Sequence, residues 1–207
     1  MLNRRTFSSS TALAVLTAGV QQAQAATAIV GQAAPAFTAL DALGKSHKLS
    51  DFKGKHVVLE WTNPGCPFVV KHYSGNMQSL QAEFTAKGVV WLSINSTATN
   101  ASDYLNPAKL TAWKTEKKSA STAMLMDESG KIGQLYSAKT TPHMFIINPQ
   151  GVLVYAGAID SVPSARVDDI KTATNYIRQG LNETLGGKAL STSSTRAYGC
   201  SVKYKDA

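Results

Sequence analysis

The sequence predicts an α/β domain with a central mixed sheet that is covered by helices on both faces. Short apolar and β-branched runs alternate with stretches of helical periodicity, the pattern of a largely parallel sheet. The last two runs are joined by the turn sequence Asn148-Pro149-Gln150-Gly151, so we expect them to form an antiparallel hairpin. A chain of 207 residues with 43% hydrophobic content can bury one sizeable core, which suggests one domain with extensions.

Five strands and a first helix follow from the periodicity. The strands are predicted at residues 57–61, 89–94, 123–126, 144–147 and 152–156. Between the first two strands, apolar side chains recur at spacings of four, three and four residues, which places them on one buried stripe of a helix. This stripe consists of Tyr73, Met77, Leu80 and Phe84.

Two more helices are expected further along the chain. One follows Pro107 and runs through Leu110 and Trp113. The other is a single amphipathic helix that ends at Gly186-Gly187, because glycine commonly terminates helices. Its apolar positions are Val167, Ile170, Thr174, Ile177 and Leu181.

The first 25 residues have the features of a secretory signal peptide. Arg4-Arg5 gives a charged start, residues 11–20 form a short apolar run, and Ala23-Gln24-Ala25 is a small-residue cleavage site. The segment Asn3 to Phe7 resembles the twin-arginine export signal of bacteria. We expect a periplasmic or otherwise exported protein without stable membrane insertion after cleavage, since the apolar run is too short to span a bilayer. An uncleaved N-terminal anchor is the alternative.

The charge balance gives little support for a nucleic-acid partner. The formal net charge of +8 falls to about +6 without the signal peptide. The densest basic cluster, Lys114 to Lys118, also contains Glu116, and no stripe alternates basic with aromatic residues. The chain has no phosphate-binding glycine loop, dinucleotide fingerprint, His-Glu-x-x-His or Cys-x-x-Cys motif, so we expect no cofactor and no structural zinc.

Cys66 is the most informative residue of the chain. It follows a predicted strand and precedes a helical stretch, and Pro67 suits the first helical position because no backbone N–H is needed there. The unpaired N–H groups and the dipole of a helix N-terminus favour the thiolate over the thiol. A buried structural cysteine is the alternative, although the surrounding Pro and Gly residues favour an exposed backbone.

The second cysteine, Cys200, lies in a C-terminal tail of different composition. Residues 191–195 read as a flexible linker, so we divide the chain into a domain at 26–190 and a tail at 191–207. Beyond the linker, Tyr198, Cys200, Val202 and Tyr204 alternate with smaller or polar residues and share one face of an extended segment. We therefore expect this segment to dock, with chance alternation as the alternative. The even cysteine count permits one disulfide, whose geometry depends on the fold.

The segment Asn63-Pro64-Gly65-Cys66-Pro67-Phe68 resembles the active-site segment of the thioredoxin superfamily, most closely the peroxiredoxin-like redoxins of the AhpC/TSA type. The resemblance covers residues 29–185 and extends to the Tyr-Gly-Cys-Ser ending at 198–201. It implies a thioredoxin-like fold in which Pro142 follows a cis peptide bond and holds the backbone beside Cys66, ready to pair with a thiol-bearing peptide.

The sequence also departs from the family patterns. Val69 stands where thioredoxins carry a second cysteine. Leu59 and Asn63 stand where a typical peroxiredoxin has proline and threonine, and residues 140–143 lack the arginine that peroxiredoxins bring to the peroxide. The usual constellation for peroxide activation is therefore incomplete.

The hypothesis that fits these features is a thiol oxidoreductase with two separated cysteines. Cys66 would attack a peroxide or a protein thiol/disulfide substrate, and Cys200 would resolve the resulting sulfenic acid or mixed disulfide. Thr62 and Asn63 could donate hydrogen bonds to the bound oxygen or sulfur, although Asn before Pro-Gly is also a common turn residue. An external thiol reductant would complete the cycle.

Two other functions are compatible with the same residues. Cys66, His143 and Cys200 could converge on a copper ion, because two thiolates and one imidazole suit a soft metal. His72 is a poorer ligand candidate, since it lies about 240° around a helix from Cys66. The third interpretation is a non-catalytic binding module on a thioredoxin fold, with an inert thiol at Cys66.

Overall fold

A computed structural model describes residues 27–205. The predicted signal peptide, residues 1–25, lies outside the described residues. Within residues 27–205, no helix has both the length and the apolar character needed to cross a membrane.

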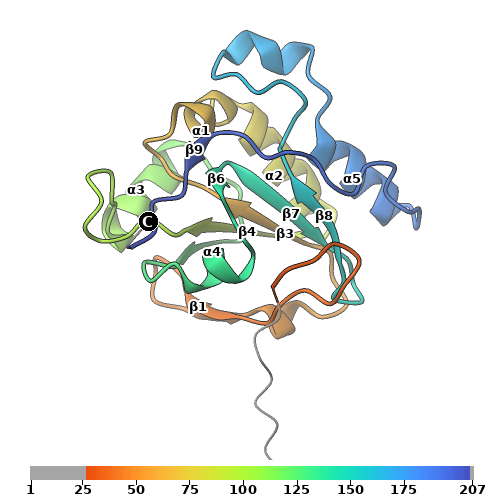
Figure 1. Cartoon of the computed structure of the whole chain (residues 1–207), viewed down its shortest axis with the longest axis horizontal. Coiled ribbons are helices and arrows are strands. Elements are labelled where there is room, and N and C mark those ends of the chain that lie inside the picture. Colours follow the sequence, from red (N-terminus) through yellow and green to blue (C-terminus); the bar gives the residue numbers. More distant parts are fainter. Residues whose placement is uncertain (1–26, 206–207) are drawn as a thin grey trace, which may run out of the picture.

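The core of the fold is a five-stranded mixed sheet with the strand order β5-β4-β3-β7-β8 (Figure 1). Strand β3 pairs in parallel with β4, which pairs in parallel with β5, whereas β7 is antiparallel to both β3 and β8. The strands are β3 (Val57–Trp61), β4 (Val90–Asn95), β5 (Ala123–Met126), β7 (His143–Ile147) and β8 (Leu153–Gly157). The predicted mixed sheet and its hairpin are confirmed, with each strand within one residue of its expected ends.

Helices cover one face of this sheet. They are α1 (Pro67–His72), α2 (Asn76–Ala86) and α5 (Tyr176–Leu185), and α3 (Pro107–Glu116) packs beside them on β5. Strand residues such as Val58, Met144 and Ile146 point into this layer, where they meet Leu80 of α2 and Ile177 of α5. The buried apolar area of this layer is a main source of the stability of the fold.

The opposite face is covered by α4 (Lys131–Leu135), the 3-10 helix η1 (Leu49–Phe52) and a hairpin of β1 (Thr38–Leu40) and β2 (Ser46–Lys48). Trp61 lies at the centre of this layer, with its ring centroid 5.1 Å from that of Phe145 and 5.6 Å from that of Tyr136. The end of β3, from which the chain turns toward Cys66, is therefore fixed by aromatic packing.

Glu60 is a buried carboxyl group on β3, between the sheet and α2. Its side chain is fully buried and accepts hydrogen bonds from four donors. These donors are Trp91 Nε1 at 2.7 Å, Tyr73 OH at 2.8 Å, Ser93 Oγ at 2.9 Å and Gln81 Nε2 at 3.0 Å. Burial raises the pKa of Glu60, and the four hydrogen bonds oppose part of that rise.

The structure corrects two of the helix predictions. The single helix expected around Tyr73 is divided into α1 and α2, because Gly75 has a φ of 133° that interrupts the helical path. All four stripe residues are nonetheless buried. The prediction of one helix from Val167 to Gly186 is wrong in its first half. Its first residues form the 3-10 helix η2 (Val167–Lys171) instead. Helix α5 starts separately after Asn175, whose side chain accepts a hydrogen bond from Arg178 N and caps the helix.

The C-terminal tail docks on the domain. Figure 1 shows it in dark blue, returning from α5 past β6 (Thr140–Thr141). Thr195 N donates to Ala156 O at 3.2 Å, so the stretch expected as a linker runs along β8. Strand β9 (Cys200–Ser201) then pairs antiparallel with β6. Val202 is buried whereas Ser201 is exposed, as the alternating pattern requires.

Candidate active site

Cys66 occupies the N-cap position of α1, with extended backbone angles and Pro67 as the first helical residue. The turn before it is closed by hydrogen bonds from Gly65 N to Asn63 Oδ1 at 2.8 Å and from Cys66 N to Asn63 O at 3.0 Å. This local sequence therefore places the sulfur at the positive end of a helix, as predicted. The side chain is only 2% exposed.

Cys200 lies directly over Cys66, although the two residues are 134 positions apart in the chain. Both are free thiols, and their sulfur atoms are 2.7 Å apart. Cys66 Sγ also donates to the backbone oxygen of Thr141 at 3.0 Å. Because Thr141 and Cys200 are register partners in the β6-β9 pair, the strand pairing itself sets the distance between the two thiols.

The two thiols have opposite shifts of pKa. Burial raises the pKa of Cys66, but the Cys200 thiol, the Thr141 side chain and backbone N–H groups are placed to stabilise the thiolate and outweigh this effect, so the pKa lies below its ordinary value. Burial and the neighbouring Cys66 both raise the pKa of Cys200. The pair therefore ionises at Cys66 first, and Cys200 keeps its proton.

Thr141 is a site residue that the sequence did not identify. Its side chain is buried, and its hydroxyl makes no hydrogen bond with any residue in the range 27–205. The same side chain lowers the pKa of Cys66, because the hydroxyl is placed to donate to the thiolate. The peptide bond between Thr141 and Pro142 is cis, as the family resemblance implied. The sequence signal that could have identified Thr141 is its position directly before Pro142.

Asn63 and Thr62 are both close to the thiol turn, but they are placed differently. Besides its turn bond, Asn63 donates from Nδ2 to Asp103 Oδ2 at 2.9 Å and to Thr97 Oγ1 at 3.3 Å, so its amide is fully engaged in holding the turn. Thr62 is buried, and its hydroxyl has no partner among the described residues. Donation from either residue to a substrate stays a prediction.

Asp103 connects the turn before Cys66 to the tail beyond Cys200. The oxygen that accepts from Asn63 also lies 3.0 Å from Lys203 Nζ. Partial burial raises the pKa of Asp103, but the contacts with Lys203 and Asn63 outweigh it and lower the pKa overall. The carboxylate is therefore charged at neutral pH and holds both segments.

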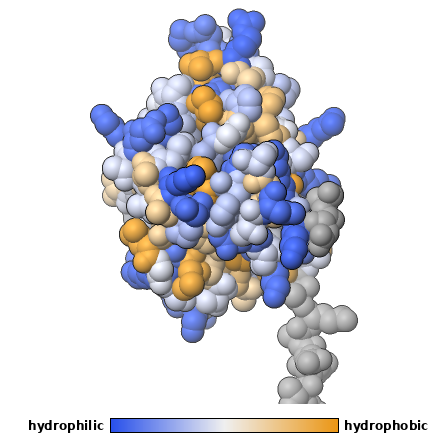
Figure 2. Space-filling model, turned by 90° about the vertical axis from the view of Figure 1, so that its left-hand side faces the viewer, coloured by the Kyte–Doolittle hydropathy of each residue, from blue (hydrophilic) through white to orange (hydrophobic). Residues whose placement is uncertain are grey.

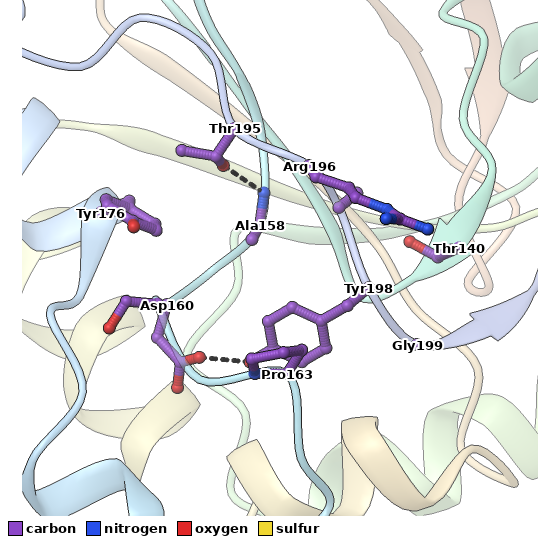
Figure 3. A pocket seen from close by; sticks show the side chains of 11 residues that line it. Thr140, Ala158, Asp160, Pro163, Tyr176, Thr195, Arg196, Tyr198 and Gly199 are labelled. Carbon is purple, nitrogen blue, oxygen red and sulfur yellow. Dashed lines mark hydrogen bonds between the residues drawn. The ribbon is translucent and has the colours of Figure 1, made fainter.

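Tyr198 anchors the tail on the other side of Cys200. Its hydroxyl donates to Asp160 (Figure 3). Its ring packs edge-on against Phe68 of α1, with centroids 5.8 Å apart. Asp160 is buried and forms an ion pair with Lys71 Nζ at 3.4 Å. His72, whose pKa burial lowers to about 4, lies 3.2 Å from the Tyr198 hydroxyl. A buried polar network therefore fixes the residue two positions before Cys200.

The structure brings Cys66 and Cys200 together but does not add a third metal ligand to them. No group of three His, Cys, Asp or Glu side chains within residues 27–205 is arranged to hold a metal ion. The His143 ring packs on Phe145 with centroids 4.4 Å apart, and its Nδ1 accepts from Lys139 N at 3.3 Å. Burial lowers the pKa of His143 to about 4, so its imidazole is neutral at physiological pH.

One side of the molecule has a surface of mixed polarity. Figure 2 shows hydrophilic groups interspersed with small hydrophobic ones over the side of the molecule that it presents.

Comparisons with known proteins place the chain among thioredoxin-like folds. Residues 30–156 match the AhpC/TSA family. A hypothetical protein from Sinorhizobium meliloti is similar in structure, with a TM-score of 0.74 and 22% identity over 87% of this chain and 97% of that one. An uncharacterised conserved protein from Geobacillus kaustophilus also has a TM-score of 0.74, with 24% identity over 86% of this chain and 94% of its own.

A third solved structure is the thioredoxin domain of a thiol-disulfide oxidoreductase from Bacteroides vulgatus. Its TM-score is 0.51, with 22% identity over 70% of this chain and 98% of that domain. At these identities the solved structures establish the fold alone. No curated protein matches the chain.

Proposed function

The chain belongs to the AhpC/TSA family, and we propose that it is a thiol-based oxidoreductase in which Cys66 is the nucleophile and Cys200 the resolving thiol. One observation carries this proposal: two free thiols lie 2.7 Å apart, one with a lowered and the other with a raised pKa. Such an asymmetric pair suits a reaction in which the Cys66 sulfur attacks the oxidant and the Cys200 sulfur then attacks the oxidised Cys66.

In the first step, the Cys66 thiolate attacks an oxidant. With a hydroperoxide, a sulfur–oxygen bond forms, the oxygen–oxygen bond breaks, and the leaving oxygen takes a proton, so Cys66 becomes a sulfenic acid. With a disulfide, a mixed disulfide forms at Cys66 and one thiolate leaves. Thr141 and the N-terminus of α1 stabilise the thiolate from which either reaction starts.

In the second step, Cys200 attacks the oxidised sulfur of Cys66. The new disulfide forms as water leaves a sulfenic acid or as a second thiol leaves a mixed disulfide. The charge on Cys66 contributes to the raised pKa of Cys200, and this contribution disappears once Cys66 is neutral, while nearby Lys203 lowers the Cys200 pKa. Oxidation at Cys66 therefore makes Cys200 a better nucleophile. An external thiol reductant then supplies two electrons and restores both thiols.

Steady-state assays of the mature chain with dithiothreitol as reductant test this proposal. We expect hydrogen peroxide or a small disulfide to be consumed much faster than by free cysteine at the same thiol concentration, because the lowered pKa of Cys66 increases the fraction of its thiol that is ionised. The faster of the two oxidants identifies the substrate class. If neither is consumed faster than by free cysteine, the oxidoreductase proposal is wrong, and the binding-module and copper interpretations remain. Export through residues 1–25 would place the enzyme in an oxidising compartment.

A further inference from the structure

The docked tail occupies the place that an extended polypeptide would need in order to reach Cys66. We propose that residues 198–204 are a built-in substrate strand, which admits small oxidants to Cys66 and keeps polypeptide disulfides out while it is docked. This inference rests on the proposed function and names the class of oxidant that the site selects.

The backbone of β6 is the first element of this inference. Its residues Thr140 and Thr141 pair with Ser201 and Cys200 of the tail, and Val202 N donates to Lys139 O at 3.0 Å. An incoming strand that presented a sulfur to Cys66 at this edge would need the same backbone groups. The tail already holds them, and it presents its own sulfur at the same place.

The fit between tail and domain depends on glycine. A Cβ atom at Gly199 would collide with the backbone oxygen of Thr141, and the φ of 136° at Gly199 is one that other residues rarely adopt. At the far end of the tail, Tyr204 fills a notch where Gly130 and Gly133 have no side chains. Gly199 and Tyr204 are therefore specifically accommodated by the surface of the domain.

Two cavities flank the start of the tail, directly before the strand that pairs with β6. One, of about 580 Å³, is lined by Asp160, Tyr176 and Tyr198 among others (Figure 3). The other, of about 570 Å³, is lined by His143 and Phe145 among others. Both cavities share Thr140 and residues 195–197 as walls, so this part of the tail runs between them.

Small and large oxidants face different obstacles at this site. The Cys66 side chain is covered by Cys200, which is itself partly exposed. Rotation of the one Cys200 side chain would open a path for a molecule of the size of a peroxide. A polypeptide would instead have to displace the whole strand, including the buried Val202, the Lys203–Asp103 ion pair and the bond from Ala98 N to Lys203 O at 2.8 Å.

Reaction of Cys66 with activated disulfides of two sizes tests the inference. The full chain carrying Cys200→Ser keeps the tail but has a single thiol, and its Cys66 thiolate attacks a pyridyl disulfide, forms a new disulfide and releases pyridine-2-thiolate, which is followed by absorbance. The small probe is dipyridyl disulfide. The large probe is a peptide of residues 197–204 whose cysteine carries the pyridyl disulfide.

A second variant, Cys200→Ser with Gly199→Val, removes the tail from β6 by steric collision. We expect its rate with the peptide to exceed that of Cys200→Ser by at least about tenfold, while the small probe reacts at a similar rate with both. If the Gly199→Val variant does not fold, Lys203→Glu in the Cys200→Ser background replaces it. This change removes the ion pair between Lys203 and Asp103 that holds the tail, at a half-exposed position. The matched control is Gly44→Ala, which also has positive φ but no neighbouring atom within 4 Å.

Equal rates of reaction with the peptide in Cys200→Ser and in Cys200→Ser with Gly199→Val would overturn the inference. It would also be overturned if Cys200→Ser, whose tail is docked, reacted with the peptide as fast as with the small probe. Failure of both dipyridyl disulfide and hydrogen peroxide to oxidise the single thiol of Cys200→Ser would instead contradict the nucleophilic role of Cys66. The two results are therefore distinguishable in one set of experiments.

Discussion

Replacement of Cys66 by serine is expected to abolish turnover of both peroxide and disulfide substrates, lowering kcat/KM by at least about a thousand-fold. The reason is that a serine hydroxyl stays protonated at neutral pH, so the donors that stabilise the Cys66 thiolate would have no anion to act on. Steady-state kinetics of the purified variant measure the loss. Cys66→Ser should keep the fold, because the substitution removes little buried volume.

The matched control for this variant is Cys200→Ser. It should still consume one equivalent of oxidant per chain, because Cys66 remains the nucleophile, and should then stop at the sulfenic acid or mixed disulfide when only a slow reductant is present. Turnover by Cys66→Ser at a substantial fraction of the wild-type rate would show that Cys200, and not Cys66, carries the reaction.

Replacement of Glu60 by alanine is expected to lower the free energy of unfolding by about 3–5 kcal/mol. The change would leave four buried donors, on Trp91, Tyr73, Ser93 and Gln81, without their acceptor. Unfolding in urea measures the loss. Glu116→Ala, at an exposed position, serves as the control and should change stability by no more than about 0.5 kcal/mol. A similar small effect for both variants would mean that the Glu60 network contributes little.

The pH dependence of stability should reveal the same carboxyl group. Because burial raises the pKa of Glu60 above 4.5, the folded state keeps a proton that the unfolded state has already lost. The contribution of Glu60 to stability is therefore complete below its unfolded pKa and is lost as the pH rises through its folded pKa. Glu60→Gln cannot titrate, so its stability should fall less steeply over that range. Identical pH profiles for the two proteins would contradict the raised pKa.

Most of the central sheet could be predicted because its strands are continuous apolar runs with clear turns between them. The hairpin of β7 and β8 was signalled by the Asn-Pro-Gln-Gly turn alone. By contrast, β1 and β2 are only three residues long, too short for a periodic pattern to emerge. The division between η2 and α5 was missed because the apolar spacing continued across Asn175, whose capping role depends on tertiary context.

The site was predictable where it depends on local sequence and not where it depends on distant contacts. Cys66 was identified from the turn and helix start around it, and the docking of Cys200 from the alternating tail. The contribution of Thr141, the bridging position of Asp103 and the Asp160–Tyr198 anchor all join segments far apart in the chain. No local pattern reports such contacts, because they exist only once the sheet has formed.

Oxidation of the full chain with one molar equivalent of hydrogen peroxide or a small disulfide, followed by peptide mapping under non-reducing conditions, tests the paired thiols most directly. We expect mass spectrometry to find a single species in which a disulfide joins Cys66 and Cys200 within one chain. Two free thiols after this treatment, or Cys66 held as a sulfenic acid or a mixed disulfide beside a free Cys200, would show that the two cysteines do not act as a pair.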